Sequence, residues 1–239
     1  MKPIYKRILL KLSGEGLMGD KPFGMDPAVI QNLSRQIKAV QETGVEVCIV
    51  VGGGNIFRGA KEASKGMNRT VADHVGMLAT VMNALYIQNA LENLGTPARV
   101  LSGLNIPEVC EHYVYRRALR HLEKGRVVIF AAGTGNPYFT TDTGAALRAS
   151  EMGCDVILKA TQVDGVYDSD PNKNPAAKRY ETVSFDEVIS CQLKVMDIAA
   201  VALARENNIP IVVFNQHGDN ALEKAVAGEG RFTIIKKEV

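Results

Sequence analysis

Apolar runs alternate along the chain with segments in which apolar residues recur every three or four positions. The runs predict strands and the amphipathic segments predict helices. Strands are expected at residues 7–13, 45–51, 99–101, 127–130, 155–159, 211–214 and 232–235, and helices at about 26–44, 70–93, 109–124, 143–148, 197–206 and 221–227. This alternation predicts an α/β fold with a mainly parallel open sheet sandwiched by helices. Without an internal repeat or linker, residues 1–239 are expected to form a single domain.

Capping residues indicate where two helices begin, and composition distinguishes one loop from the rest of the chain. Asp26 and Pro27 have the residue types of an N-cap and a first helical position. Ser184 and Glu187 have the spacing of a capping box. Residues 161–180 are rich in proline, aspartate and asparagine. They are expected to form an ordered functional loop with a hairpin around Val166 and Tyr167.

The helix expected at 70–93 has apolar residues on more than one face. Met77 and Ile87 fall away from the face of Leu78, Val81 and Leu85 at 100° per residue. A helix that covers a sheet has one face to bury, so the remaining apolar face predicts a two-fold contact between subunits, with Met77 outward. The alternative is that other helices of the same chain cover it.

Composition narrows the function classes. The chain has 239 residues, 46% of them hydrophobic, and a formal net charge of +2. That charge predicts no strong attraction to nucleic acid or a membrane surface. The four cysteines are far apart and the histidines lack metal-ligand spacing. With no signal peptide or spanning stretch recognisable, a cytoplasmic protein with reduced thiols is expected.

The segment at 132–142, Ala-Gly-Thr-Gly-Asn-Pro-Tyr-Phe-Thr-Thr-Asp, is the strongest candidate for chemistry. It joins a strand to a helix and is rich in glycine and hydroxyl residues. Backbone N–H groups and the positive end of a helix favour a bound anion at such a place. The segment therefore predicts a phosphate site, with an ordinary tight turn as the alternative.

Two further glycine-containing loops follow strands. Lys11 ends the first strand just before Gly14. An unpartnered lysine is rarely buried, so this residue is either a charge held for phosphate oxygens or an outward-facing lysine at a sheet edge. Residues 52–55 (Gly-Gly-Gly-Asn) end the second strand, and Arg58 follows them. A glycine fingerprint at 14–19 lacks the helix that a dinucleotide site requires, and no P-loop is present.

Asp73 and Asp197 are acidic residues near predicted helix starts. A surface acid is the simplest interpretation of Asp73, and an N-cap that of Asp197. Ligands of open α/β sheets lie beyond the carboxyl ends of the strands. Three glycine-rich loops meeting there suit two phosphate-bearing ligands, which indicates phosphoryl transfer.

Five motifs, at 11–15, 52–59, 73–77, 133–142 and 163–167, resemble those of the bacterial uridylate kinases, and the resemblance extends over nearly the whole chain. These enzymes have the amino-acid kinase fold. The resemblance implies transfer of the γ-phosphoryl group of ATP to UMP, giving UDP, in pyrimidine nucleotide biosynthesis. It implies Mg²⁺ with the ATP, and no protein ligand to the metal is assigned. The N-terminal part would form mainly the UMP site and the C-terminal part mainly the ATP site.

The resemblance also implies roles for matching positions. The ATP-binding residues would be Lys11, Leu12, Ser13, Gly14, Gly54, Arg58, Thr161, Tyr167 and Asp170. The UMP-binding residues would be Gly53, Asp73, Thr134, Gly135, Asn136, Pro137, Tyr138, Phe139, Thr140 and Thr141. Catalysis would rest on Lys11 and Lys159. Asp142 or Asp197 would orient these lysines or the metal ion. Gln162 stands where many members have a lysine.

Regulation and assembly are implied in the same way. The segment linked to activation by GTP would comprise Gly19, Asp20, Lys21, Pro22, Phe23 and Gly24. UTP would inhibit, and the subunits would form a homohexamer.

Two other functions remain open from the residues. One is a nucleotide sensor or anion-storage protein on the same fold, which would not need the cation of Lys11. The other is a relative that phosphorylates a carboxylate or carbamate. A small acid needs no stacking surface, so Asn136, Tyr138, Phe139 and Thr141 argue against the latter.

Overall fold

The computed structural model describes residues 2–59, 66–171 and 173–238. Within this part of the chain the strands form one sheet in the order β4-β3-β5-β2-β1-β6-β8-β9-β7. The strands are β1 (Arg7–Leu12), β2 (Glu46–Val51), β3 (Ala98–Ser102), β4 (Glu111–His112), β5 (Val127–Ala131), β6 (Val156–Thr161), β7 (Thr182–Ser184), β8 (Ile211–Asn215) and β9 (Phe232–Lys236). The β8–β9 pair is antiparallel and the other neighbours are parallel. The predicted α/β fold with a mainly parallel open sheet is confirmed.

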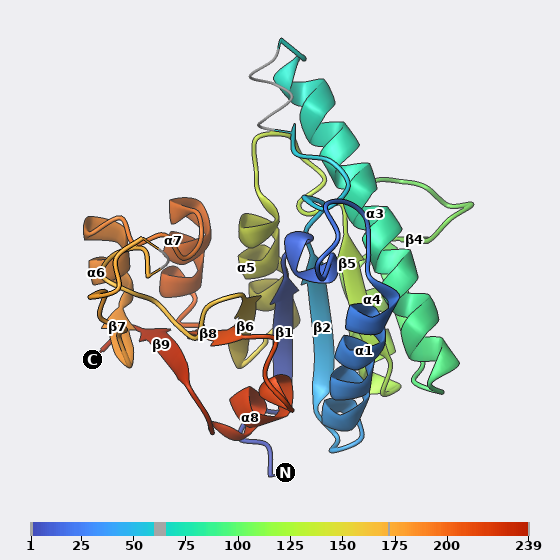
Figure 1. Cartoon of the computed structure of the whole chain (residues 1–239). Helices are drawn as coiled ribbons and strands as arrows, with labels where there is room; N and C mark the ends of the chain where they lie inside the picture. Colours follow the sequence, from blue (N-terminus) through green and yellow to red (C-terminus); the bar gives the residue numbers. More distant parts are fainter. Residues whose placement is uncertain (1, 60–65, 172, 239) are drawn as a thin grey trace.

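Helices cover both faces of this sheet (Figure 1). They are α1 (Pro27–Gln41), α3 (Arg69–Asn93), α4 (Tyr115–Glu123), α5 (Thr141–Met152), α6 (Phe185–Ser190), α7 (Ile198–Glu206) and α8 (Ala221–Ala227), with a 3₁₀ turn, η1, at Glu15–Leu17. Apolar side chains of α1, α3 and α8 share one buried cluster with Ile8, Leu10 and Leu12. Those of α4 to α7 share another with Leu9. The two-residue alternation along β1 therefore supplies a core to each face.

The local signals have the expected structural roles. The Asp26 carboxylate accepts a hydrogen bond from the Ala28 N–H at 2.8 Å, and the Ser184 hydroxyl accepts one from the Glu187 N–H at 3.0 Å. The hairpin is also confirmed, since Tyr167 bridges Arg179 and the Tyr180 N–H donates to the Val166 carbonyl.

The prediction of one helix at 109–124 is wrong in its first third. Glu111 and His112 form β4, which pairs in parallel with Leu101 and Ser102 of β3. The Tyr113 N–H donates to the Ser102 carbonyl at 2.9 Å, so the sheet edge satisfies backbone groups that a helical turn would otherwise pair. α4 begins only at Tyr115. β7, which pairs with β9, was not predicted.

The orientation of α3 also differs from the prediction. Met77 and Ile87 are buried, whereas Leu78 and Met82 are about half exposed. A Cβ atom on Gly53 would lie 2.9 Å from the Cβ of Ala79, so α3 packs directly on this glycine. The Gly76 carbonyl and the Thr80 nitrogen would lie within 3.2 Å of the same Cβ, so the face of α3 that contains Gly76 and Thr80 is turned toward this glycine. Val71, Leu78, Met82 and Tyr86 then form the exposed apolar face of α3, which replaces the predicted one.

Among the described residues, no helix combines the length and apolar character needed to cross a bilayer.

Candidate active site

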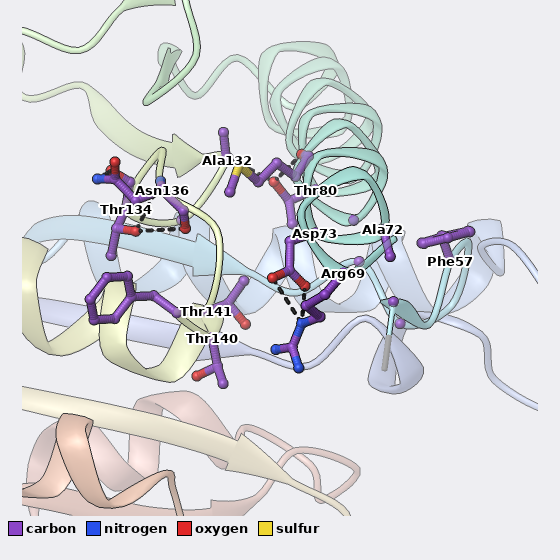
Figure 2. A pocket seen from close by; sticks show the side chains of 17 residues that line it. Phe57, Arg69, Ala72, Asp73, Thr80, Ala132, Thr134, Asn136, Thr140 and Thr141 are labelled. Carbon is purple, nitrogen blue, oxygen red and sulfur yellow. Dashed lines mark hydrogen bonds and ion pairs between the residues drawn. The ribbon is translucent and has the colours of Figure 1, made fainter. Parts of the chain in front are cut away.

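Two cavities lie beyond the carboxyl ends of the central strands. The α3 cavity, of about 220 Å³, is lined by Gly53, Gly54, Phe57, Gly59, Arg69, Ala72, Asp73, Gly76, Met77, Thr80, Ala132, Gly133, Thr134, Asn136, Phe139, Thr140 and Thr141 (Figure 2). The β6 cavity, of about 630 Å³, is lined by Ser13, Glu15, residues 159–163 and 165–171, residues 191–195 and Val213. The α3 cavity contains most of the residues that the resemblance assigns to UMP. Of the residues assigned to ATP, Ser13, Thr161, Tyr167 and Asp170 line the β6 cavity, whereas Gly54 lines the α3 cavity.

Two lysines and one aspartate form a buried cluster at the strand ends. Lys11 and Lys159 occupy paired positions in the register of β1 and β6, and both project to the face covered by α5. The Lys11 Nζ lies 2.7 Å from Asp142 Oδ1, and the Lys159 Nζ lies 2.8 Å from Asp142 Oδ2. Lys159 also donates to the Val195 carbonyl. One carboxylate therefore holds two ammonium groups side by side.

The charges in this cluster depend on one another. Burial opposes ionisation of Asp142, but Lys11 and Lys159 outweigh it and lower the pKa of this carboxyl to about 2. Burial lowers the pKa of Lys159, and Lys11 adds to the effect, while Asp142 opposes it. Asp142 is thus ionised at neutral pH, where it stabilises the positive charge that a phosphate would meet.

Asp197 is the N-cap of α7, as its simplest interpretation predicted. Its carboxylate accepts the Ala200 N–H at 2.8 Å. It also accepts the hydroxyl of Thr143 at 2.9 Å and that of Thr140. Because Thr140 caps α5, Asp197 fixes the helix start that positions Asp142. Of the two carboxylates considered, Asp142 contacts the lysines directly and Asp197 supports Asp142.

Arg69 and Asp73 lie one turn apart on α3 and point toward each other in Figure 2. The Arg69 Nε lies 2.9 Å from both Asp73 oxygens. Asp73 also accepts the Tyr138 N–H at 2.8 Å, and the Arg69 guanidinium lies 5.6 Å from the Tyr138 ring centroid. Tyr138 has φ of 72°, a left-handed conformation uncommon for a bulky residue. The pair therefore connects the 133–140 loop to α3 over the cavity.

A second link between α3 and this loop is Thr80. Its hydroxyl accepts the Ala132 N–H at 2.7 Å and donates to the Met77 carbonyl. Ala132 is buried with φ of 62°, so this bond satisfies a backbone group in an unfavourable conformation. The loop is thereby held in one shape where it forms the cavity wall.

The β6 cavity is walled by the predicted functional loop. The Tyr167 hydroxyl donates to Asp164 at 2.5 Å, and the Arg231 Nε lies 2.9 Å from the same carboxylate. Burial by itself would raise the pKa of Asp164, but the hydrogen bond from Tyr167 and the charge of Arg231 outweigh it, so this pKa is lowered. Thr161 and Gln162 line the cavity on the sheet side. An amide at Gln162 supplies no positive charge there.

Several predicted site residues lie outside the linings of both cavities: Lys11, Leu12, Gly14, Arg58, Gly135, Pro137, Tyr138, Asp142, Asp197 and residues 19–24. Leu12 is fully buried beneath the loop. An Arg58 Nη lies 2.8 Å from Glu15 Oε1, so this side chain would have to change partner to reach a phosphate. The ligand roles of these residues remain predictions.

The α3 cavity also includes residues that the sequence reasoning missed. Arg69, Asp73, Gly76 and Thr80 follow one another at helical spacing on a single face of α3. Since Asp73 was predicted, extending from it by three and four residues would have found the others.

The residues present do not form a resident metal site among those described. No group of three or more histidine, cysteine, aspartate or glutamate side chains gathers at one point. Both Asp142 oxygens are engaged by lysines. A divalent ion would enter here with phosphate oxygens and water as its main ligands, as Mg²⁺ commonly does.

Comparison with known proteins agrees with this arrangement. The sequence model of the amino acid kinase family matches residues 6–215. The uridylate kinase of Paramagnetospirillum magneticum is 59% identical over 234 residues, which are 98% of each chain. That of Anaplasma marginale is 61% identical over 97% of this chain and 94% of the relative.

The fold is likewise similar to solved structures. The UMP kinase of Bacillus anthracis superposes with a TM-score of 0.95 at 38% identity, covering 100% of this chain and 98% of that one. The UMP kinase of Ureaplasma parvum has a TM-score of 0.93 at 40% identity, with 99% and 100% covered.

Proposed function

The chain belongs to the amino acid kinase family and, within it, to the uridylate kinases, and from this premise we propose that it transfers the γ-phosphoryl group of ATP to UMP. UMP would occupy the α3 cavity, formed mainly by the N-terminal part of the chain together with the loop after β5. ATP would occupy the β6 cavity, formed mainly by the C-terminal part. The products are ADP and UDP.

One observation supports this proposal most directly: the cluster of Lys11, Lys159 and Asp142 adjoins lining residues of both cavities. Lys159 lines the β6 cavity, and Asp142 directly follows Thr141, which lines the α3 cavity. Two ammonium groups at this place can neutralise charge on the phosphoryl group as it moves. A storage protein or sensor has no need for two lysines held there.

The acceptor itself is a phosphate, which is ionised at neutral pH, so no strong general base is needed. The cavities hold the reactants in line, and the lysines stabilise the developing charge. Asp142 keeps both ammonium groups in place, and Asp197 keeps the start of α5 in place. Mg²⁺ would arrive as part of the substrate MgATP and offset charge on its phosphates.

The acceptor preference provides the direct test. We expect kcat/KM for UMP to exceed that for CMP by at least a hundred-fold, and dTMP to be inactive, because a polar pocket rejects an unmatched base edge strongly. A coupled assay of ADP release would compare UMP, CMP and dTMP. Glutamate and carbamate would serve as small-acid acceptors.

The outcomes separate the alternatives. ADP release with glutamate or carbamate and none with UMP would identify a relative acting on small acids. Nucleotide binding without ADP release for any acceptor would indicate a sensor. Comparable kcat/KM for UMP and CMP would contradict the proposed specificity.

Assembly and regulation are further parts of the proposal. Subunits would pair through the exposed apolar face of α3 and associate into a homohexamer. GTP would activate through residues 19–24, where Phe23 is exposed, and UTP would inhibit. The protein would act in the cytoplasm, where its substrates are found.

A charge on the exposed apolar face of α3 is expected to separate the subunits. Met82→Glu would place a carboxylate where Val71, Leu78 and Tyr86 also contribute apolar surface. We expect a smaller assembly by light scattering coupled to size exclusion at micromolar protein, with the secondary structure retained. Arg120→Glu, on the exposed side of α4, is the matched control. An unchanged mass for Met82→Glu would place the interface elsewhere.

A further inference from the structure

Two asparagines form a buried amide pair below the glycine loop that follows β2. Asn83, on α3, and Asn55, after Gly54, are at most 2% exposed. The Asn83 Nδ2 donates to Asn55 Oδ1 at 2.7 Å, and the Asn55 Nδ2 donates back to Asn83 Oδ1 at 3.0 Å. Each side-chain amide therefore donates one hydrogen bond to the other and accepts one from it.

The remaining hydrogens of the pair bind the backbone. The Asn83 Nδ2 also donates to the Gly52 carbonyl at 2.7 Å, and the Asn55 Nδ2 to the Gly24 carbonyl at 2.9 Å. The Gly24 N–H in turn donates to the Asn55 carbonyl. All four amide hydrogens are used, so the pair fixes the loop after β2, the segment before α1 and helix α3 relative to one another.

The loop after β1 rests on the same pair. A Cβ atom on Gly14 would lie 2.5 Å from Asn55 Oδ1 and 2.7 Å from the Gly54 nitrogen. One on Gly52 would lie 3.1 Å from the Gly14 nitrogen. The two glycine loops are thus in direct backbone contact, with Asn55 beneath them. One loop leads into the β6 cavity through Ser13 and Glu15, and the other lines the α3 cavity through Gly53 and Gly54.

Burying amides is unfavourable unless they are fully paired, and an apolar pair would fill this space without that requirement. What an apolar pair could not do is specify the direction of the Gly52 and Gly24 carbonyls. We propose that Asn55 and Asn83 are positioning residues that set the two glycine loops, and hence both cavities, relative to each other. This proposal rests on the proposed function for the identity of the two ligands.

The two cavities should therefore lose affinity together when the pair is broken. Asn83→Leu keeps the branched shape and the number of heavy atoms of the side chain and removes both donations. We expect the Kd values of ATP and of UMP, each measured alone by calorimetry, to rise at least five-fold. Ile87→Ala is the matched control: Ile87 is fully buried one turn further along α3 and contacts no loop of either cavity by hydrogen bond. It should lower the melting temperature while leaving both Kd values within two-fold.

Hydrogen exchange supplies a readout that does not depend on the ligands. In Asn83→Leu without nucleotide, we expect faster exchange at the amides of residues 13–16 and 52–55 than in Ile87→Ala. Should Asn83→Leu fail to fold, Asn83→Ser is used, which shortens the side chain and removes the Asn55 contact.

Loss of affinity in only one cavity, or equal losses in the Ile87→Ala control, would overturn the positioning role. So would unchanged exchange at both loops. These outcomes are distinct from failure of the proposed function, which would appear as a wild-type protein that binds both nucleotides and has no UMP kinase activity.

Discussion

Replacing Lys11 by methionine is expected to lower kcat by about a thousand-fold, the upper range for loss of a preorganised charge that acts on the transition state. Lys11 is 5% exposed and paired with Asp142, so its ammonium group is held in place before negative charge develops on the phosphoryl group. It does not line the α3 cavity, so KM for UMP should change by less than about three-fold. Steady-state kinetics with UMP and ATP varied separately would measure both values.

The position of the charge, rather than its loss from the protein as a whole, should explain this effect. Lys124→Met, at the exposed end of α4, removes the same charge and should leave kcat unchanged. Methionine is unbranched and only one heavy atom shorter than lysine, so the substitution at position 11 leaves little empty space. A kcat within ten-fold of wild type for Lys11→Met would remove Lys11 from the catalytic group.

Asp142→Asn is expected to lower both activity and stability. It leaves Lys11 and Lys159 facing each other in a buried place without a compensating carboxylate, and breaking such a cluster costs about 3–5 kcal/mol. The lysines should then separate or lose a proton, so we expect kcat to fall at least a hundred-fold. Urea unfolding at pH 7 and steady-state kinetics would measure the two effects. Asp186→Asn, which removes an exposed carboxylate paired with Arg205, is the control.

The pH dependence of unfolding distinguishes this explanation from a simple packing defect. The pKa of Asp142 is lowered to about 2 in the folded protein, from an ordinary value of 3.8. A lowered carboxyl pKa contributes stability above the unfolded value, and that contribution is lost as pH falls through the folded value. The stability gap between wild type and Asp142→Asn should therefore narrow by roughly 2 kcal/mol between pH 4 and pH 2. A gap that stays constant over this range would argue against the ion pairs.

The central strands could be predicted from the sequence, whereas the edge strands could not. Apolar runs predicted the central strands because parallel strands buried on both faces have few polar residues. The two short edge strands were not predicted. β4 has the sequence Glu-His, which has no strand signal of its own and forms only because β3 offers it backbone partners. Its pairing also shortened the predicted helix that became α4.

The candidate site shows the same division. The sequence identified the glycine loops, Lys11 and the 132–142 segment as candidates. Glycines, hydroxyl residues and a lysine directly after a buried strand contribute little to a core, so a ligand is the better explanation for them. The sequence did not show whether Asp142 or Asp197 pairs with the lysines, because both aspartates lie near a predicted helix start. Only the packing of α5 and α7 over the sheet separates their roles.

The inward side of α3 could not be predicted for a related reason. Apolar residues lie around most of this helix, so periodicity alone does not select a buried face. The direct contact of Ala79, Gly76 and Thr80 with Gly53 selects it, and Asn83 lies on the same side of the helix.

By itself, the sequence determined the α/β class, the central strands and the loops that hold the chemistry, because local patterns of burial and turn residues depend on near neighbours. Tertiary structure decided which residues from distant segments meet. The register of β1 with β6 brings Lys11 beside Lys159, and the seating of α5 places Asp142 between them. Long-range pairing and helix packing depend on all of the contacts at once, so no single segment of the sequence specifies them.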